Sequence, residues 1–542
     1  MLKSGSKKGS MIAKIMNEPQ FLPRKVPDYM RKKGGSSYWI GSMVLTAFMY
    51  EVFTGLIILF YYDPASAYAS TENFVNNVPF GSLILTTHLY GAYIMIVLTY
   101  IHLLRNFFVG AYKNPRKNQW ITGILLLLLT LAVGFFGYSM SGDVLAIDAT
   151  DVGRGIAAGA PLIGVYLRSL FFGSGTDLSL FHWMLGWHIV LAVAIGILFS
   201  FHFFMAEYNT VMPARKDSDY KAPAIDMGNP EYKPWFPNNL LYMAELSLLI
   251  ISAIMLIPSL LGILPGVPAL FSPFPQVAAT NPLAANVPPY PPWFLLFVYK
   301  ELDFEMVQGI GPFWGTVAFV GPPLMYLLAL PYLDVSNSLK LRDRPITVSM
   351  GIIGIVYLIG LTIWGGLTPG VPIPTWQVLA FFLVPGVLIV GLVLLISHLL
   401  EEGAIKFTNP ENLYIALTIL GLSSFGVGIL AIALITNYLL IYGVPLILLL
   451  MVVGICLVYI FAFIKTGGAM FGKKEREDYL KGSTYTVTAS GFTLSAIVIF
   501  IEISIIPPTS VMSSSLYGIG LGILFLIAAA LLKIYRSATY GE

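Results

Sequence analysis

Long apolar runs separated by short polar stretches dominate the chain from residue 38 onwards. Each run has enough residues, at about 1.5 Å of rise per residue, to cross a hydrocarbon layer of about 30 Å as a helix. We therefore predict an all-α polytopic membrane protein with about 12 transmembrane helices. The runs lie near residues 38–60, 80–110, 119–138, 180–206, 238–263, 311–332, 347–367, 376–399, 412–436, 438–465, 487–506 and 516–535.

The charged residues between these runs predict how the helices are oriented. Basic side chains collect in every second connection, whereas the other connections carry acids such as Asp63, Glu72 and Asp143. Because cytoplasmic loops carry an excess of Lys and Arg, we place both termini in the cytoplasm and the protein in the cell membrane. The basic connections contain Arg105, Lys113, Arg116, Lys117, Arg215, Lys216, Lys221, Lys340, Arg342, Arg344, Lys465, Lys473, Lys474, Arg476 and Lys481.

The composition supports a membrane protein and limits its chemistry. Only 11% of the residues are charged, whereas soluble proteins carry about 25%. The single cysteine, Cys456, excludes a disulfide within the chain and a covalent C-x-x-C-H haem. An iron–sulfur cluster would have to be held by a partner. Nothing in the sequence predicts a nucleic-acid partner.

The order of the runs divides the chain into four segments. Residues 1–37 form a basic cytoplasmic segment without the apolar core and cleavage site of a secretory signal peptide. Residues 38–210 hold the first four helices, residues 211–404 the next four, and residues 405–542 the last four. Two outer connections, near 139–179 and 264–310, are long enough to predict a functional or partner-binding role.

Four histidines lie in two of these runs at equal spacing. His88 and His102 are 14 residues apart, and so are His188 and His202. Fourteen steps of about 100° leave about 40° of rotation, so the two rings of a helix face one side, roughly 21 Å apart. If both helices run from outside to inside, His88 meets His188 near the outer face. His102 then meets His202 near the cytoplasm, which predicts one bis-histidine haem in each leaflet.

A histidine in an apolar helix need not bind a metal. A single one is more often a hydrogen-bonded packing residue, or a proton carrier in a transporter. Two pairs with identical spacing favour ligation of iron. Glycines share the interval, because Gly41 and Gly55 in the first run, and Gly123 and Gly137 in the third, are also 14 residues apart. Since glycine lets a flat ring approach closely, the first four helices are predicted to form a bundle with two ring-shaped slots.

Six stretches between residues 35 and 400 carry a family resemblance. They are WIGSMVLTAFMYEVFTGLIILFYYDP, HLYGAYIMIVLTYIHLLRNFF, WITGILLLLLTLAVGFFGYS, KPWFPNNLLY, NPLAANVPPYPPWF and LPYLDVSNSLKLRDRP. On these stretches the chain resembles cytochrome b of the bc-type quinol-oxidising complexes. The second stretch includes the family's glycine and arginine as Gly91 and Arg105.

The resemblance implies eight core helices, with two non-covalently bound haems in the first four. It implies b-type haem, although an a-type ring would use the same histidines. It assigns Gly91 to cofactor binding and Arg105 to a haem propionate. It also implies quinol oxidation at the outer face with a Rieske iron–sulfur protein, and often quinone reduction at the inner face. Further respiratory subunits are expected as partners, with a terminal oxidase as one candidate.

The chain departs from that family where quinol would be oxidised. Pro-Pro-Trp-Phe replaces Pro-Glu-Trp-Tyr, so Pro292 stands in place of the glutamate that accepts a proton, which proline cannot do. The tryptophan is kept as Trp293 and is assigned to cofactor binding. Glu301 and Asp303 follow as candidate proton acceptors, and the alternative is that they form an ordinary charged helix end. At the inner site, Asn239 replaces a usual acid.

Three functions are compatible with these features. The leading hypothesis is the di-haem cytochrome b subunit of a respiratory quinol-oxidising oxidoreductase, which needs partner subunits for activity. The first alternative is an electron-relay subunit of a terminal quinol oxidase without a full Q-cycle. The second is a haem-free secondary transporter, which fits the helix count but gives no reason for the glycine interval.

Overall fold

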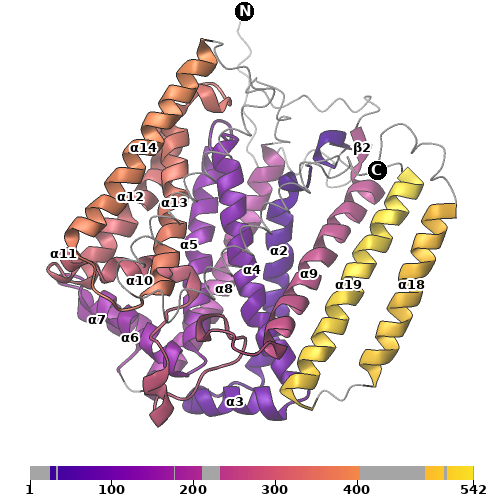
Figure 1. The fold of residues 1–542 in the computed structure, drawn as a ribbon, viewed down its shortest axis with the longest axis horizontal. Helices are drawn as coiled ribbons and strands as arrows, with labels where there is room; N and C mark the ends of the chain where they lie inside the picture. The colour runs from indigo at the N-terminus through magenta and orange to yellow at the C-terminus, as the bar shows by residue number, and fades with distance from the viewer. Residues whose placement is uncertain are drawn as a thin grey trace, which may run out of the picture.

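The computed structural model describes residues 25–31, 35–175, 177–209, 232–402, 483–505 and 509–540. Figure 1 shows that helices dominate this part of the chain. Ten of the predicted apolar runs fall in it, and each forms a helix. The runs at 412–436 and 438–465, and most of the basic segment 1–37, lie outside the described residues.

In the described ranges, ten long helices form the body of the molecule, and short helices lie in three of the connections between them. The long helices are α2 (Ile40–Leu59), α4 (Gly81–Phe108), α5 (Lys117–Ser139), α8 (Asp177–Tyr208), α9 (Leu240–Ile263), α12 (Pro312–Leu333), α13 (Pro345–Leu367), α14 (Thr375–Glu401), α18 (Ser483–Ser504) and α19 (Val511–Tyr540). The short helices are α3 (Ala67–Asn77), α6 (Val144–Ala158), α7 (Gly164–Phe172), α10 (Leu296–Leu302) and α11 (Glu305–Gln308).

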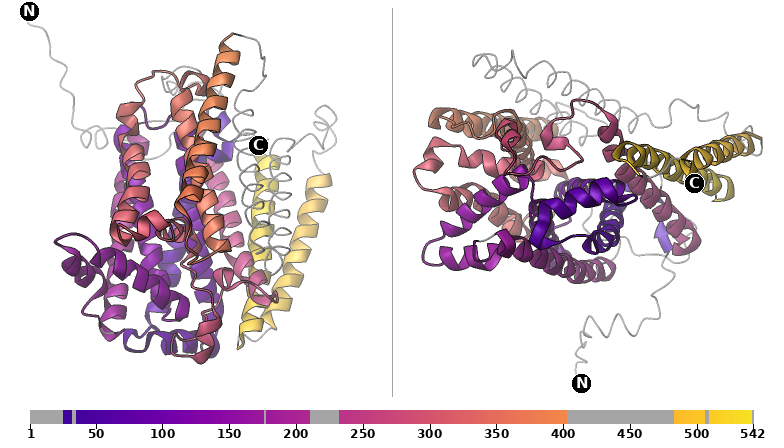
Figure 2. Two further views of the ribbon diagram at one scale, coloured as in Figure 1. Left: turned by 60° about the vertical axis from the view of Figure 1, so that its left-hand side comes forward. Right: turned by 90° about the horizontal axis from the view of Figure 1, so that it is seen from below.

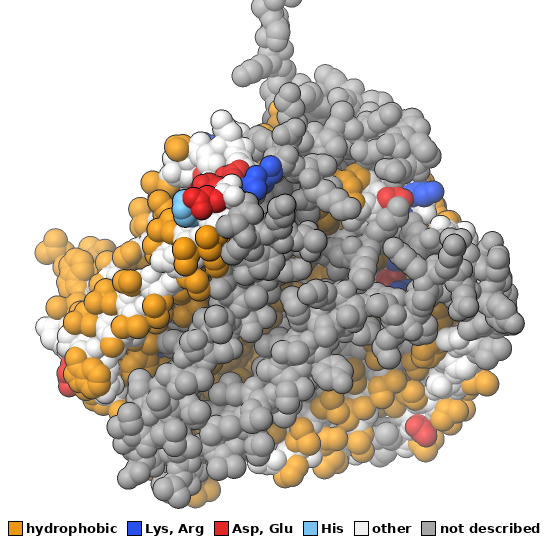
Figure 3. Space-filling view, turned by 45° about the horizontal axis from the view of Figure 1, so that its top comes forward, with side chains coloured by type: hydrophobic (Ala, Val, Ile, Leu, Met, Phe, Trp, Pro, Cys, Tyr) orange, Lys and Arg blue, Asp and Glu red, His pale blue; other side chains and the backbone are white. Residues whose placement is uncertain are grey.

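Nine helices in the described ranges are long and apolar enough to cross a membrane, and α18 has a shorter apolar stretch. Their outer surface agrees with this. Figure 3 shows hydrophobic side chains along the flank of the molecule, with charged side chains gathered near the end where α14 terminates. That end carries an exposed ion pair between His398 Nε2 and Glu402 Oε1, 3.2 Å long. The protein is therefore a polytopic all-α membrane protein, as predicted.

The first four long helices form one bundle, with α2 packed on α4 and α5 packed on α8 (Figure 1). Helix α9 flanks the bundle on one side, and α12, α13 and α14 flank it on the other. A short antiparallel ladder joins β1 (Lys25–Pro27), which precedes α2, to β2 (Tyr232–Pro234), which precedes α9. The described strands therefore serve only to connect the entries of two helices.

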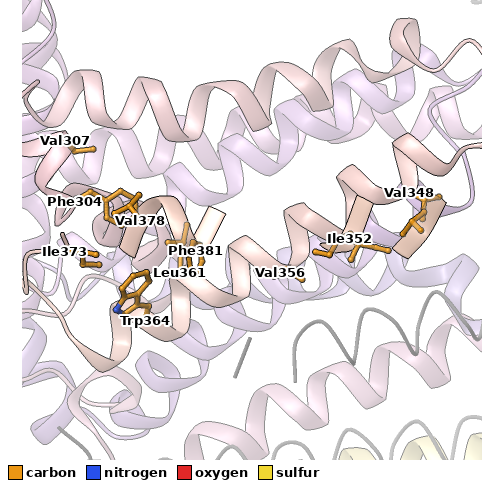
Figure 4. Packing of buried hydrophobic residues seen from close by; sticks show 12 residues of the cluster. Phe304, Val307, Val348, Ile352, Val356, Leu361, Trp364, Ile373, Val378 and Phe381 are labelled. Atoms are coloured by element: carbon orange, nitrogen blue, oxygen red, sulfur yellow. The ribbon is translucent and has the colours of Figure 1, made fainter. Parts of the chain in front are cut away.

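The second half of the chain has a hydrophobic core of its own (Figure 4). Apolar side chains of α13, α14 and the loop before α12 interlock there, and most of them are almost completely buried. The labelled members are Phe304, Val307, Val348, Ile352, Val356, Leu361, Trp364, Ile373, Val378 and Phe381. This core fixes α10 and α11 against the neighbouring long helices.

A buried polar cluster joins the two halves at the inner side. Lys113, after α4, donates from Nζ to Asp334 Oδ1 at 3.0 Å, and Tyr112 donates to the other carboxylate oxygen. Arg344, at the start of α13, donates from Nη1 to the Tyr112 hydroxyl at 2.6 Å. Because every charge in this cluster has a partner, burial of the Asp334 carboxylate is compensated.

The two long outer connections pack on each other. Asp143 caps α6 by accepting from the backbone N–H of Ala146 at 2.9 Å, and its second oxygen accepts from the N–H of Gln276 at 2.7 Å. Tyr299 of α10 donates its hydroxyl to the carbonyl of Ala149 at 2.7 Å. One layer of short helices therefore covers the end of the bundle that the sequence predicts to face outwards.

Helix α19, near the C-terminus, packs closely along α9 and also reaches α4 (Figure 2). Small residues make this possible, because a Cβ on Gly518 would collide with Ser259 Oγ. Ser252 donates from Oγ to the carbonyl of Gly522 at 2.7 Å. Nearer the helix end, Arg536 Nη1 and Glu245 Oε2 form a buried ion pair of 2.5 Å. Helix α19 therefore belongs to the packed body of this chain.

We expect Gly518→Leu to destabilise the protein, because the new side chain must occupy the space of Ser259 on α9. Overpacking of a close interface costs about 1–3 kcal/mol. Thermal unfolding of the detergent-solubilised protein, followed by circular dichroism, measures the effect. The matched control is Gly491→Leu on α18, where a Cβ meets nothing within 4 Å. Equal unfolding temperatures for the two variants would contradict the close packing of α19 on α9.

Candidate functional site

Helices α4 and α8 bring the four histidines together in two pairs. The ring centroids of His88 and His188 lie 6.4 Å apart, with 67° between the ring planes. The centroids of His102 and His202 lie 6.5 Å apart, with 72° between the planes. The structure therefore places side by side the residues that the spacing and the topology predict as partners.

The separation of the rings fits a metal atom between them. Two metal–nitrogen bonds of about 2 Å, and about 1.1 Å from each nitrogen to its ring centroid, add to roughly 6 Å. No group of three or more His, Cys, Asp or Glu side chains in the described ranges could hold a metal ion. Each pair therefore suits a metal that brings its own equatorial ligands, as iron does in haem.

Protein groups hold the Nδ1 atom of three of these rings. The contacts are His188 Nδ1 to the Val133 carbonyl at 3.0 Å, His202 Nδ1 to Thr122 Oγ1 at 3.0 Å and His88 Nδ1 to Thr54 Oγ1 at 2.8 Å. A hydrogen bond from Nδ1 leaves Nε2 as the nitrogen with a free lone pair, and it also orients the ring. Such contacts are the usual support for histidines that ligate metals.

The fourth histidine has a different neighbour. Asn106, one turn along α4, places Nδ2 at 3.1 Å from His102 Nε2, so ligation through Nε2 requires this amide to turn aside. Arg105 donates from Nη1 to Asn106 Oδ1 at 2.9 Å, and its guanidinium lies 4.4 Å from the centre of the Tyr38 ring. These contacts keep the predicted propionate partner at the inner end of the bundle, beside His102.

The four predicted glycines each face one histidine ring. A Cβ would lie 3.3 Å from His102 Cε1 at Gly41, 3.2 Å from His88 Cε1 at Gly55, 3.2 Å from His202 Cε1 at Gly123 and 2.8 Å from His188 Cε1 at Gly137. Distances this short leave little or no room for a side chain. The shared interval therefore reflects contact between each glycine and a ring.

Gly91 differs from these four glycines because it faces a carboxyl group and not a histidine ring. A Cβ at this position would collide with Oε1 of Glu51, a residue of α2. The second oxygen, Oε2, lies 3.1 Å from His88 Nδ1. Glu51 is not among the residues predicted from the sequence, although a single acid inside the apolar run 38–60 is a signal that could have pointed to it.

The residues around Trp293 form an aromatic cluster at the outer end of the bundle. Tyr93 of α4 lies 5.7 Å from Trp293 and 6.1 Å from Phe294, measured between ring centroids. Phe294 is buried and packs on α5, where a Cβ on Gly134 would lie 3.1 Å from its ring. The departure from tyrosine to phenylalanine therefore fits an apolar site within the bundle.

Glu301 and Asp303 have different surroundings, although they lie only two positions apart. Asp303 Oδ2 accepts from Lys300 Nζ at 2.9 Å, and the same ammonium donates to the carbonyls of Thr368 and Val371 at 2.7 and 3.2 Å. Glu301 is only 4% exposed, and its buried Oε2 has no hydrogen-bond partner. An ordinary charged helix end therefore does not describe Glu301, whereas Asp303 is part of an ion pair.

Burial changes the pKa values of Glu301 and Asp303. It raises the pKa of Glu301 well above the ordinary value, since little compensates for the desolvation of the carboxylate. Burial also raises the pKa of Asp303, but Lys300 opposes the shift. A raised pKa makes the deprotonated form of this carboxyl group a stronger base than an exposed glutamate.

Two family models and several known proteins match this chain. The family model for cytochrome b(N-terminal)/b6/petB matches residues 93–279, and the model for cytochrome b(C-terminal)/b6/petD matches residues 279–384. A cytochrome b of Sulfolobus acidocaldarius is 41% identical over 384 residues, which cover 68% of this chain and 67% of that protein.

Two further relatives extend the comparison. A menaquinol:cytochrome c reductase cytochrome b subunit of Bacillus subtilis is 38% identical over 138 residues, 25% of this chain and 62% of that protein. A solved structure described as a hyperthermophilic respiratory Complex III has a TM-score of 0.51 at 22% identity, over 73% of this chain and 96% of that chain. At this identity the solved structure supports the fold alone.

We expect Glu301→Gln to stabilise the folded protein at high pH. In the unfolded chain a glutamate ionises near pH 4.3, about its ordinary pKa, whereas the folded state holds its proton to higher pH. The protein therefore loses stability as the pH rises above the pKa that Glu301 has in the unfolded chain. Glutamine does not ionise, so the Glu301→Gln variant avoids this loss. The unfolding temperature of the variant should exceed that of the parent at pH 8.

The same comparison at pH 4 should give nearly equal unfolding temperatures, because the parent carboxyl is then largely protonated in both states. Glu305→Gln, which changes an exposed acid, is the matched control and should follow the parent at both pH values. A Glu301→Gln effect of the same size at pH 4 and pH 8 would contradict the burial of a titrating group.

Proposed function

The chain belongs to the cytochrome b family, and from this premise we propose that it is the di-haem subunit of a respiratory quinol-oxidising complex. Family membership makes it a haem-binding membrane protein of respiratory electron transport. Our proposal adds two bis-histidine haems, a Rieske iron–sulfur partner and both termini in the cytoplasm. The paired histidines favour it over a haem-free transporter.

One observation carries the proposal: the two histidine pairs have nearly equal ring separations of 6.4 and 6.5 Å, and a glycine faces every ring. A histidine kept only for packing needs neither an apposed histidine nor an apposed glycine. Two similar slots, one near each face of the membrane, suit two flat cofactors that span it in series.

We assign the outer haem to His88 and His188 and the inner haem to His102 and His202. When bound, each haem supplies a centre that gains and loses one electron. The chain's own residues hold it: the Nδ1 contacts orient the imidazoles, and the glycines leave space for the ring. Arg105, at the inner end of α4, is placed to neutralise a propionate.

At the outer end, we propose that quinol binds beside Trp293 and that Glu301 accepts a hydroxyl proton when quinol is oxidised. Full oxidation of quinol to quinone releases two electrons and two protons. The Rieske partner would accept one electron and the outer haem the other, and the second proton would pass to the solvent. Pro292 has no titratable group, so the acid must come from elsewhere, and Glu301 is a buried carboxyl on the helix that follows the motif.

A second function within haem chemistry is favoured by one observation at the inner end. Asn239 is completely buried and both polar atoms of its side-chain amide are without a hydrogen-bond partner, where the resemblance predicts an acid. An amide cannot supply the protons that quinone reduction consumes. This supports an electron relay to a terminal oxidase over a full Q-cycle.

We expect His188→Ala to lose the outer haem and retain the inner one, because the His188 ring is the one that faces His88 across the outer slot. His102→Ala should lose the inner haem alone. Reduced-minus-oxidised absorption spectra and haem extraction give the haem content per chain. His182→Ala, which removes an exposed histidine of the same helix α8, is the matched control and should keep both haems. Retention of both haems in His188→Ala and His102→Ala would overturn the assignment.

We also expect Glu301→Gln to slow quinol oxidation by the purified complex on the order of 10²-fold, the usual size of a general-base contribution. Asp303→Asn should have a smaller effect, since that carboxylate already pairs with Lys300. The exposed Glu305→Gln serves as the control. Unchanged turnover in the double variant of Glu301 and Asp303 would remove both residues as proton acceptors.

A further inference from the structure

Glu51 is an acid in the middle of α2, surrounded by the apolar run that crosses the membrane. Its side chain is only 11% exposed, and Oε2 lies 3.1 Å from Nδ1 of His88. The hydrogen bond of His88 Nδ1 goes to Thr54 Oγ1 at 2.8 Å, and the carboxyl group of Glu51 lies beside it. The carboxyl group therefore touches the proposed ligand of the outer haem from the side opposite to the metal-facing nitrogen.

This contact distinguishes His88 from the other three histidines. Thr54 accepts from His88 Nδ1 at 2.8 Å, while its own hydroxyl donates to the carbonyl of Tyr50 at 2.8 Å. The polar neighbours of the other three rings are uncharged groups: the Val133 carbonyl, the Thr122 hydroxyl and the Asn106 amide. In the described residues an acid contacts one haem site and not the other.

The fold makes space for this acid. A Cβ on Gly91 would collide with Glu51 Oε1, so the glycine of α4 leaves the volume that the carboxyl group occupies. Oε1 itself is buried and has no hydrogen-bond partner. Burying a carboxyl group with one oxygen unsatisfied is unfavourable, which indicates that its position serves something other than stability.

The inner site has charge of the opposite sign. Arg105 is three residues from His102 on α4, and its guanidinium donates to Asn106, the side chain that contacts the His102 ring. A negative charge near iron favours the ferric state, and a positive charge favours the ferrous state. The two side chains therefore bias the two haem sites in opposite directions.

We propose that Glu51 is a positioning residue that lowers the reduction potential of the haem held by His88 and His188. The proposal rests on the di-haem function argued above. Oε2 of Glu51 lies 3.1 Å from Nδ1 of His88, and a negative charge at this position stabilises the oxidised state of an iron held by His88.

The test is a redox titration of the purified full-length protein, followed by absorbance, with Glu51→Gln as the variant. Glutamine preserves the volume and an oxygen acceptor but removes the charge. We expect the midpoint potential of the outer haem to rise and that of the inner haem to stay the same. Repeating the titration in the His102→Ala background isolates the outer haem and assigns the change.

Thr46→Val is the matched control on the same helix. Thr46 Oγ1 lies 2.8 Å from Ser247 Oγ, at the contact with α9, and the substitution should leave both potentials unchanged. An unchanged outer potential in Glu51→Gln at full haem content would overturn the proposal.

If Glu51→Gln loses the outer haem, Glu51→Asp decides the outcome. Recovery of the haem and its low potential by the shorter carboxylate would support the proposal, whereas loss in both variants would overturn it. A parent protein without two haems would instead refute the proposed function, so the two failures are distinguishable.

Discussion

The α-helical period controls the first half of this molecule, because every residue that faces a proposed ring must recur after a whole number of turns. An interval of 14 residues nearly satisfies this requirement, and it recurs on α2, α4, α5 and α8. Two helices use it for histidines, and their two neighbours use it for glycines that face those rings. The bundle therefore places two histidine pairs of nearly equal separation one after the other along its helices.

The second constraint is the free-energy cost of burying a charged group among apolar side chains. The buried acids discussed above differ in whether a partner compensates for this cost. Two are buried in ion pairs, Asp334 with Lys113 and Glu245 with Arg536. Glu51 and Glu301 each keep a buried oxygen without a hydrogen-bond partner. Since such groups reduce stability, they persist where the chemistry needs them. Both lie beside the proposed path of electrons and protons.

Much of the fold and of the candidate site could be predicted from the sequence, because both depend on local periodicity. The apolar runs predict the helices, and the interval of His88 and His102 predicts the pairing. The role of Gly91 and the burial of Glu301 could not be predicted, since one depends on a carboxyl group that reaches across from α2 and the other on long loops folded over the bundle. The packing of α19 on α9 could not be predicted either. Glycines are common in membrane helices, and only the contact of Gly518 with α9 shows which face of α19 is packed.

The replacement of the motif glutamate by Pro292 changes where a proton acceptor can stand. Pro292 precedes a single turn, Trp293–Leu295, after which α10 begins, so the motif itself now serves to start a helix. Glu301 lies near the end of that helix, among residues covered by the second-half core. An acceptor there is held by a helix packed on α13, and the aromatic cluster of Trp293 and Tyr93 is left apolar. In the proposed function, the quinol ring and its proton would therefore be handled by separate elements that pack in one body.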